Sequence, residues 1–288
     1  MPDGILIIDK PAGWTSMDVC AKVRGIFHEK RVGHGGTLDP MATGVLPVFV
    51  GRATRAVEFA EHRRKEYVAG LRLGLVTDTQ DITGTVLEQR PVSVAREQVE
   101  TILPRFLGEI RQIPPMYSAI KVNGQKLYEL ARKGQEVERK PRSVTIYALE
   151  LLEQTGETEF TLRCLCSKGT YIRTLCHDIG QALGCGGTMS SLRRTMAAGF
   201  TLEQAAALEE VQRQGAALLL PTDSLFTDCP ILPLKSEGLE RRVRCGNPIA
   251  LPGTPDGTYR VYSRDGCFLC LSRAEHGTLT SIKNFFGA

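Results

Sequence analysis

Over the first 230 residues, short apolar runs alternate with stretches in which apolar residues recur every three or four positions. Continuous or alternating apolar runs are typical of strands, and the three-to-four spacing is typical of helices. The expected strands cover residues 5–8, 45–50, 65–73, 85–92, 144–153 and 160–166, with a further extended piece beginning at 192. The expected helices cover residues 19–27, 53–61, 99–107, 126–132 and 172–183.

Cap and breaker residues predict where some of these elements start and end. Ser16 is expected to be the N-cap of the first helix, and Pro104 to interrupt the helix over 99–107. The sequence TLEQ at 201–204 is a capping box and predicts a helix after it.

The order of the strands favours one fold class. A turn at 83–84 directs the strand over 85–92 back along its predecessor, and the runs at 144–153 and 160–166 look like long central strands. Antiparallel pairing of this kind fits a sheet packed on one face better than a doubly wound parallel sheet. We therefore expect an α+β fold with a mainly antiparallel, mixed sheet flanked by helices.

A domain boundary is expected near residue 230, because Pro221 and the loop around 228–230 interrupt regular structure. We expect one large domain over 1–230 and a small β domain over 231–288, whose short strand-like runs surround Gly266.

Residues 115–143 form a predicted insertion that projects from the large domain. Pro114 and Pro115 end regular structure before it, Asn123-Gly124 predicts a turn, and Gly134 predicts a helix stop.

The insertion also carries the excess charge. Between residues 121 and 142 there are seven basic and three acidic residues, a surplus of +4 that equals the net charge of the whole chain. A surplus confined to one segment is expected of an element that contacts phosphates, although a solvated helix face with mixed charges is the alternative. The candidate phosphate contacts are Arg132, Lys133, Arg139 and Lys140.

Composition excludes several classes of protein. No apolar run approaches a membrane span, and the N-terminus lacks the features of a signal peptide, so we expect a cytoplasmic protein with no membrane partner. The nine cysteines are then expected to be reduced thiols. Cys267 and Cys270 have zinc-like spacing, but no second pair accompanies them, so we expect no metal there and both to line a strand.

One loop, over residues 31–47, has the features of a chemical site. Three glycines precede Asp39, which allows the backbone to turn tightly and approach a ligand closely. Pro40 keeps Asp39 out of any helix, so its carboxylate is presented from a stiffened loop. On composition alone, an ordinary turn or connector remains open.

Residues 33–46 (GHGGTLDPMATGVL) resemble the aspartate motif of the pseudouridine synthases, in the TruB branch found in bacteria. The other motifs of that family follow in order: DKPAG at 9–13, KEY at 65–67, PMYSA at 115–119 and SKGTYIR at 167–173. The resemblance runs from about residue 4 to 194 and fades beyond 225.

This resemblance implies the pseudouridine synthase fold and an enzyme that converts uridine 55 in the T-arm of tRNA to pseudouridine. It implies that the insertion is a thumb that closes over the tRNA arm. The short tail after residue 231 matches poorly the PUA-type RNA-binding domain that commonly follows this catalytic domain, so we expect at most a reduced version of it.

The resemblance assigns the catalytic roles to three residues. Asp39 is the expected nucleophile, attacking either C1′ of the ribose or C6 of the base, and needs no metal or redox cofactor. Arg173 is expected to pair with Asp39, lowering the pKa of the carboxyl group and keeping it ionised. Tyr67 is expected to stack on the flipped uracil; as a free phenol near pKa 10 it would be a poor base for removing the C5 proton.

Four further residues are expected to bind the substrate. His34 would fill the space left by the extruded base, since a uridine inside the folded tRNA elbow must be flipped out to react. Tyr171 and Leu192 would pack the pocket walls. Lys10 would buttress the pocket, with an exposed loop lysine as the alternative.

Two other function classes stay open. An RNA-binding or RNA-folding protein on the same scaffold would lack chemistry, but Asp39, Tyr67 and Arg173 are all present. A guide-RNA-dependent pseudouridine synthase would be a subunit of a larger particle. The basic insertion favours a stand-alone monomer that holds its own tRNA without guide RNA, and an unrelated hydrolase with an aspartate nucleophile is a more distant third.

Overall fold

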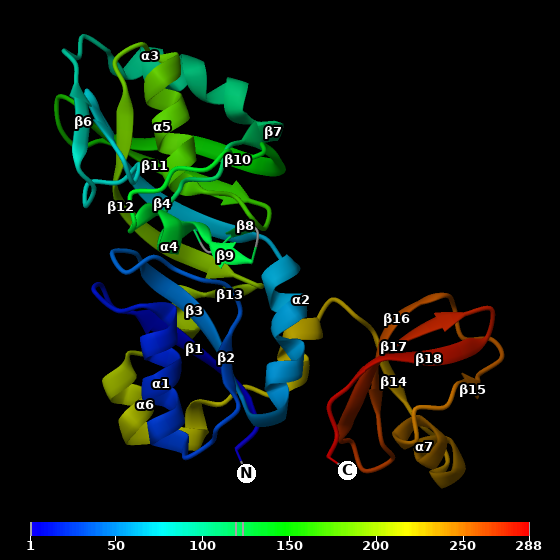
Figure 1. Cartoon of the computed structure of the whole chain (residues 1–288). Coiled ribbons are helices and arrows are strands. Elements are labelled where there is room, and N and C mark those ends of the chain that lie inside the picture. Colours follow the sequence, from blue (N-terminus) through cyan, green and yellow to red (C-terminus); the bar gives the residue numbers. More distant parts are fainter. Residues whose placement is uncertain (1, 119, 123, 288) are drawn as a thin grey trace.

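A nine-stranded sheet organises the chain from Gly4 to Thr201 (Figure 1). The computed structural model describes residues 2–118, 120–122 and 124–287. The strands follow the order β1-β3-β12-β4-β11-β10-β7, with β2 beside β3 and β13 beside β12. Their bounds are β1 Gly4–Lys10, β2 Val32–His34, β3 Thr43–Val50, β4 Lys65–Leu73, β7 Gly108–Gln112, β10 Arg142–Gln154, β11 Glu159–Cys166, β12 Gly187–Ala197 and β13 Phe200–Thr201.

The sheet is mixed, as predicted. Every pair of neighbours in it is antiparallel except β12 and β3, which run parallel where Arg193 lies beside Thr43 and Arg194 beside Gly44. That parallel contact brings the β12 strand to the end of the loop that precedes β3.

Helices cover the sheet in two groups. In Figure 1, α3 and α5 lie over β10, β11 and β12, whereas α1 and α6 lie beside β1 and β3. The main helices are α1 Ser16–Phe27, α2 Val57–His62, α3 Arg96–Ile102, α4 Leu127–Ala131, α5 Ile172–Ala182, α6 Leu208–Gln214 and α7 Glu237–Arg244, and the 3-10 turns are η1 Gly51–Ala56, η2 Leu103–Phe106, η3 Leu202–Gln204, η4 Gly215–Leu218 and η5 Thr222–Phe226.

The helix α5 shows why the apolar spacing was a good guide. Ile172, Leu175 and Ile179 recur on one face and are at most 5% exposed, because that face packs on the sheet. Burying each such side chain stabilises the fold by about 1.5–3 kcal/mol. The same spacing correctly predicted α1, α4 and the pair α3 and η2, which meet next to Pro104.

Two predictions about helix starts were wrong in detail. Thr15, not Ser16, is the N-cap of α1; it forms a capping box with Asp18, which leaves the Ser16 hydroxyl for another contact. The capping box at 201–204 forms, but only around the single turn η3, since Ala205 returns to an extended conformation and α6 starts at Leu208.

Two predicted strands also differ. The strand expected over 85–92 is only β6 Val86–Gln89, which is exposed and pairs with the mostly buried β5 Leu75–Thr77 in a separate ribbon, because the chain leaves the main sheet at Gly74. The piece expected from 192 begins at Gly187, where pairing with β4 starts. Of the long strands, β11 is central, but β10 is next to the edge strand β7, which was not predicted.

The insertion has a small core of its own. It contains the hairpin β8 Lys121–Val122 and β9 Gln125–Lys126 followed by α4, and Met116, Leu127 and Leu130 are buried together. In the predicted Asn123-Gly124 turn, Asn123 lies outside the described residues. Gly134 ends the turn after α4 with a φ of +68°, as its helix-stop prediction requires.

A second sheet begins at Ile231. Its order is β14-β16-β17-β18-β15, with bounds β14 Ile231–Pro233, β15 Ile249–Ala250, β16 Gly257–Tyr262, β17 Phe268–Glu275 and β18 Thr278–Asn284. The helix α7, which was not predicted, packs beside this sheet (Figure 1). Cys270 is buried in β17, but Cys267 is exposed just before it, so only one of the two lines a strand.

Aromatic rings join this second body to α2 of the first. Phe226 lies 5.3 Å from Phe59 and 5.8 Å from Phe285, measured between ring centroids, and Phe285 stacks on Phe268 at 5.2 Å. Such pairs contribute about 0.5–1.5 kcal/mol each beyond the burial of their area. An ion pair between Lys283 and Glu58 at 2.7 Å adds a polar contact at the same junction.

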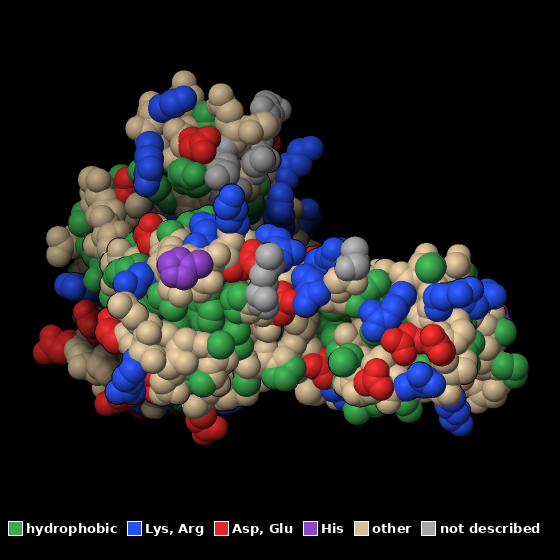
Figure 2. Space-filling model, turned by 90° about the horizontal axis from the view of Figure 1, so that it is seen from below, with side chains coloured by type: hydrophobic (Ala, Val, Ile, Leu, Met, Phe, Trp, Pro, Cys, Tyr) green, Lys and Arg blue, Asp and Glu red, His purple; other side chains and the backbone are tan. Residues whose placement is uncertain are grey.

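Charges of both signs occur near this junction. Figure 2 shows Lys and Arg side chains gathered between the two bodies, with Asp and Glu among them. Within the part of the chain that the structure describes, no helix is long and apolar enough to cross a membrane.

Candidate active site

The loop from Gly35 to Ala42 is held between two buried anchors. Leu38 and Ala42 are 3% and 0% exposed, so Asp39 lies between residues that are fixed in the core. Gly44 follows with a φ of +101°, and a Cβ atom there would lie 2.2 Å from the carbonyl oxygen of Arg194. Only glycine fits this close approach of the loop to β12.

A second segment, residues 10–16, is hydrogen-bonded along this loop. The Gly13 amide donates to the Pro40 carbonyl at 2.8 Å. The Ser16 hydroxyl donates to the Leu38 carbonyl at 3.2 Å and accepts from the Leu38 amide at 2.8 Å. Both neighbours of Asp39 in the sequence are therefore tied to this segment.

Lys10 lies beneath the same contact. Its side chain is fully buried, and Nζ donates to the carbonyls of Pro11 at 2.8 Å, Trp14 at 2.7 Å and Pro40 at 3.3 Å. Burial lowers the pKa of Lys10 to about 8, against the opposing effect of the Asp39 charge. The alternative of an exposed loop lysine is wrong, and the structure places Lys10 beneath the Asp39 loop.

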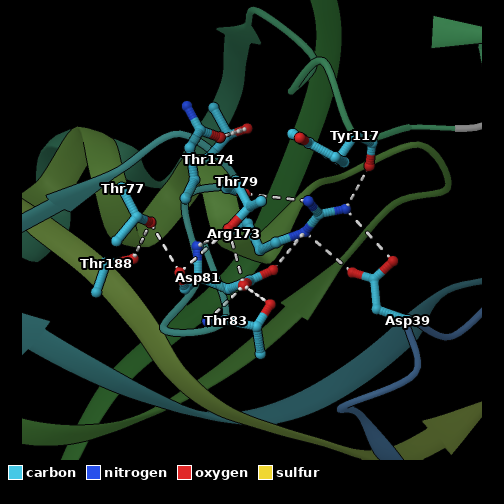
Figure 3. A network of polar contacts seen from close by, with 10 residues as sticks. Asp39, Thr77, Thr79, Asp81, Thr83, Tyr117, Arg173, Thr174 and Thr188 are labelled. Carbon is cyan, nitrogen blue, oxygen red and sulfur yellow. Dashed lines mark hydrogen bonds and ion pairs between the residues drawn. The ribbon is translucent and has the colours of Figure 1, made fainter. Parts of the chain in front are cut away.

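Arg173 meets Asp39 in a two-point contact. In Figure 3 the guanidinium of Arg173, in the first turn of α5, points at the Asp39 carboxylate. Nε lies 3.0 Å from Oδ2, and Nη2 donates to Oδ1 at 3.3 Å. The predicted pairing of these residues is therefore present, and its planar geometry restricts the orientation of the carboxylate.

Arg173 also faces a second carboxylate that sequence reasoning missed. Asp81 is 5% exposed, and its Oδ2 lies 3.8 Å from Nε of Arg173. Its other oxygen accepts from the Thr79 hydroxyl at 2.9 Å and the Thr83 amide at 3.0 Å (Figure 3). The polar sequence DTQDIT at 78–83 could have indicated a buried carboxylate in a turn, whereas the sequence prediction covered only a turn at 83–84.

The pKa of Asp39 is shifted in the direction opposite to the predicted one. Burial within the site raises the pKa of this carboxyl group, and Arg173 opposes that effect while Asp81 adds to it. Arg173 thus acts in the expected direction but is outweighed by desolvation. The Asp39 side chain is still 35% exposed, so a substrate can reach it.

Arg194, which was not predicted as a site residue, also supports the loop that carries Asp39. It is 1% exposed in β12, and its guanidinium donates to the carbonyls of Val45 at 2.7 Å, Gly36 at 3.1 Å and Thr37 at 3.4 Å. These oxygens precede and follow Asp39 in the sequence. Arg194 therefore fixes the shape of the loop through its backbone.

Tyr67 lies beside Arg194 in the sheet. The two residues are partners in the β4 and β12 register, and Tyr67 is 8% exposed. Burial raises the pKa of the Tyr67 hydroxyl, against the effect of the Arg194 charge. A raised pKa leaves even less of the phenol ionised at neutral pH, so the hydroxyl is a poorer base than in a free tyrosine.

The other predicted pocket residues come from three elements. Leu192 is buried in β12 opposite Ala69, two positions from Arg194 and on the same face. His34 ends β2, half-buried; its Nδ1 is buried without a partner in the described structure, and burial lowers its pKa. Tyr171 occupies the N-cap position of α5, where its backbone is held by Gln112 at 3.0 and 3.2 Å.

The four candidate phosphate contacts in the insertion are not equivalent. Arg132, Lys133 and Lys140 are exposed. Arg139 turns into the insertion, where it donates to the Pro114 carbonyl at 3.1 Å and pairs with Glu136 at 3.0 Å. Among the residues described, no three His, Cys, Asp or Glu side chains are grouped so that they could hold a metal.

Comparison with protein families identifies the chain. Residues 24–172 match the model of the TruB family pseudouridylate synthase N-terminal domain, and residues 173–227 match that of the tRNA pseudouridylate synthase B C-terminal domain. The chain belongs to the TruB family. The division between the two family models falls within α5, and the second model includes β12, a strand of the large sheet.

Curated relatives agree with this membership of the TruB family. The tRNA pseudouridine synthase B of Dechloromonas aromatica is 46% identical over 281 residues, covering 96% of this chain and 93% of that one. The protein of the same name from Syntrophomonas wolfei is 45% identical over 281 residues, covering 95% and 94%. TruB membership implies isomerisation of uridine to pseudouridine in tRNA.

Solved structures confirm the pseudouridine synthase fold. A chain from a Cbf5-Nop10-Gar1 complex superposes with a TM-score of 0.76 at 27% identity, over 98% of this chain and 85% of that one. A chain from an H/ACA RNP bound to a substrate RNA containing 2'-deoxyuridine gives 0.75 at 25% identity, over 99% and 85%. Both similarities continue beyond residue 227, where the TruB family models end.

Proposed function

We propose that this protein converts the uridine at position 55, in the T-arm of tRNA, to pseudouridine, with Asp39 as the nucleophile. The observation that carries the proposal is the Asp39 carboxylate itself. It is reachable by substrate, oriented by a two-point contact with the buried Arg173, and set in a backbone tied down on both sides. A preorganised carboxylate is what nucleophilic catalysis requires.

Uridine and pseudouridine contain the same atoms, so the proposed reaction is an isomerisation. The N1 to C1′ bond breaks, the uracil turns, a bond forms between C5 and C1′, and the hydrogen of C5 leaves as a proton while N1 gains one. Attack by Asp39 on C1′ would form a transient ester at the ribose, and attack on C6 a transient ester at the base. Either route uses the ionised carboxylate and releases it at the end.

The remaining site residues take supporting roles in this proposal. The Tyr67 ring, buried in β4 beside Arg194, would stack on the flipped uracil, with Leu192 and Tyr171 as walls. His34, half-buried at the end of β2, would occupy the space vacated in the RNA. Lys10 would hold the loop by its three carbonyl contacts.

The tRNA would be held by the insertion over 115–143, working with the domain over 1–230. Arg132, Lys133 and Lys140 expose their charges, whereas Arg139 serves the insertion internally. Asp39, Tyr67 and Arg173 all come from one chain, so we propose that a monomer suffices. The second sheet, over 231–288, would extend the RNA-binding face as a reduced PUA-like domain.

A guide-RNA-dependent activity is the second candidate, because the chain superposes well on proteins solved within H/ACA and Cbf5 complexes. The insertion favours the stand-alone enzyme. The test is to incubate the purified protein alone with a T-arm minihelix carrying 5-tritiated uridine, since formation of the C5 bond releases that hydrogen.

Tritium release without any added guide RNA is the expected result, and chemical mapping should place the pseudouridine at position 55. A matched minihelix with cytidine at that position should give no release. Activity that requires an added guide RNA, or pseudouridine at another position only, would contradict the proposal.

A further inference from the structure

The segment 13–16 contains Trp14, a residue that has no role in the proposed reaction. Gly13 is bonded to Pro40 and Ser16 to Leu38, so the two strands of chain run past each other with Trp14 and Thr15 opposite Asp39. Trp14 is further held by its own carbonyl, which accepts from Lys10 Nζ at 2.7 Å. Its backbone is thus fixed close to the candidate nucleophile.

The side chain of Trp14 does not belong to any of the buried apolar clusters of the described residues. It is 37% exposed, and among the described residues its indole makes no ring contact or cation–π contact. Met17, three residues on at the start of α1, is 53% exposed. More than a third of the Trp14 side chain is therefore available for contact, on a segment whose backbone is fixed beside the Asp39 loop.

Charges of both signs surround Trp14. Asp18 accepts from the Thr15 amide at 2.9 Å and the Thr15 hydroxyl at 2.7 Å, and these bonds lower its pKa and keep it ionised. Beneath the segment lies the cation Lys10, and Arg194 adds a second positive charge behind the loop. Because the cations and carboxylates offset each other, a contact of RNA with this rim would depend on the indole ring rather than on charge.

We propose that the Trp14 indole is a stacking platform for a base of the substrate RNA that adjoins the isomerised uridine. Single-stranded RNA is recognised by splayed bases that stack on aromatic side chains, because every base offers a π face. The extruded uridine occupies the site at Asp39, so a nucleotide attached to it must pass the rim where Trp14 stands. This inference rests on the proposed function and adds a contact to it.

Trp14 is the only tryptophan of the chain, so its fluorescence reports on this position alone. Titration of the full-length protein with the T-arm minihelix should quench the emission in a saturable way. Minihelices that lack one base at a time, 5′ and 3′ of the target uridine, should retain the quench in all cases except the stacked position. Loss of that base should weaken binding about tenfold to a hundredfold.

Two variants separate the ring from the apolar surface. Trp14→Phe keeps an aromatic face and should hold the Michaelis constant within a few-fold of wild type, whereas Trp14→Leu should raise it about tenfold or more. The RNA that lacks the stacked base should bind Trp14→Leu as well as it binds wild type. Melting temperatures are measured for both, and the base-deletion titrations decide the matter if Trp14→Leu does not fold.

The outcomes distinguish this inference from the proposed function. Emission that does not change on RNA binding, together with a wild-type Michaelis constant for Trp14→Leu, would overturn the stacking role while pseudouridine still forms. Failure to form pseudouridine in the T-arm, with quenching that follows one base, would overturn the assigned substrate position and leave the stacking contact in place.

Discussion

Two buried arginines contact the site around Asp39 in different ways. Arg173 faces carboxylates, with Asp39 at 3.0 Å and Asp81 at 3.8 Å, and it also donates to the carbonyls of Thr79 at 3.1 Å and Tyr117 at 2.8 Å. Arg194 directs its guanidinium to backbone carbonyls of Gly36, Thr37 and Val45. Both side chains are at most 5% exposed, so burial is not what separates them.

The difference lies in what each contact can control. A guanidinium between two carboxylates orients the proposed nucleophile and opposes the rise in its pKa that burial causes. A guanidinium among carbonyl dipoles sets the path of the backbone and leaves its positive charge unneutralised. The charge of Arg194 lowers the pKa of His34 and the pKa of Lys65. For both groups burial is the larger cause, and together the two effects lower the pKa of Lys65 to about 8.

The largest effect is expected from removing the charge of Asp39, the proposed nucleophile. Asp39→Asn keeps the shape of the side chain, so the protein should fold and bind tRNA but release no detectable tritium from 5-tritiated uridine. Arg173 would still face Asp81, which limits the loss of stability to below about 3 kcal/mol. Release at near wild-type rates from a folded Asp39→Asn protein would remove Asp39 from the mechanism.

The second prediction concerns Arg173→Lys, which keeps the positive charge but not the planar fork. An ammonium cannot make the two-point contact with Asp39, so the orientation of the carboxylate should relax. We expect turnover to fall by about 100-fold or more, with a smaller change in melting temperature than for Arg194→Lys. Single-turnover rates at saturating tRNA measure the effect, and an unchanged rate would show that the pairing is only structural.

The third prediction is the matched change at Arg194. In Arg194→Lys, a single ammonium replaces a guanidinium that reaches three carbonyls, and buried acceptors lose their donors. The cost should be about 3 kcal/mol, equivalent to a fall in melting temperature of roughly 6–12 °C. If Arg194→Lys melts like wild type but is inactive, the assignment of Arg194 to backbone shape is wrong.

The smallest effect expected is on pH dependence. In the proposed mechanism Asp39 must be ionised to attack, so we expect activity to be lost as pH falls through the pKa of Asp39, which burial raises above the ordinary value of 3.8. Asp81 contributes to that increase, so Asp81→Asn should lower the pKa of Asp39 and move the acid limb of the rate profile to lower pH. Single-turnover rates across pH measure this, and a shift to higher pH would contradict the arrangement of charges around Arg173.

Local sequence determined much of the architecture and the centre of the site. The spacing of Ile172, Leu175 and Ile179 predicted α5, and alternation along 65–73 predicted β4, because each pattern records which side chains face the core. The run from Gly33 to Pro40 predicted an aspartate presented from a stiffened loop for a different local reason: the glycines permit a tight turn, and Pro40 keeps Asp39 out of a helix. The resemblance to a family then supplied Arg173 as its partner.

Tertiary structure alone decided what surrounds that aspartate. Asp81 and Arg194 join the site because β12 lies between β3 and β4 and α5 packs over it, contacts between residues far apart in the chain. The edge strand β7 exists because β10 offers it hydrogen bonds, and its polar sequence shows no alternation that would predict it. The pKa of Asp39 was misjudged for the same reason, since desolvation depends on every chain segment that excludes water from the carboxylate, and no local pattern records that.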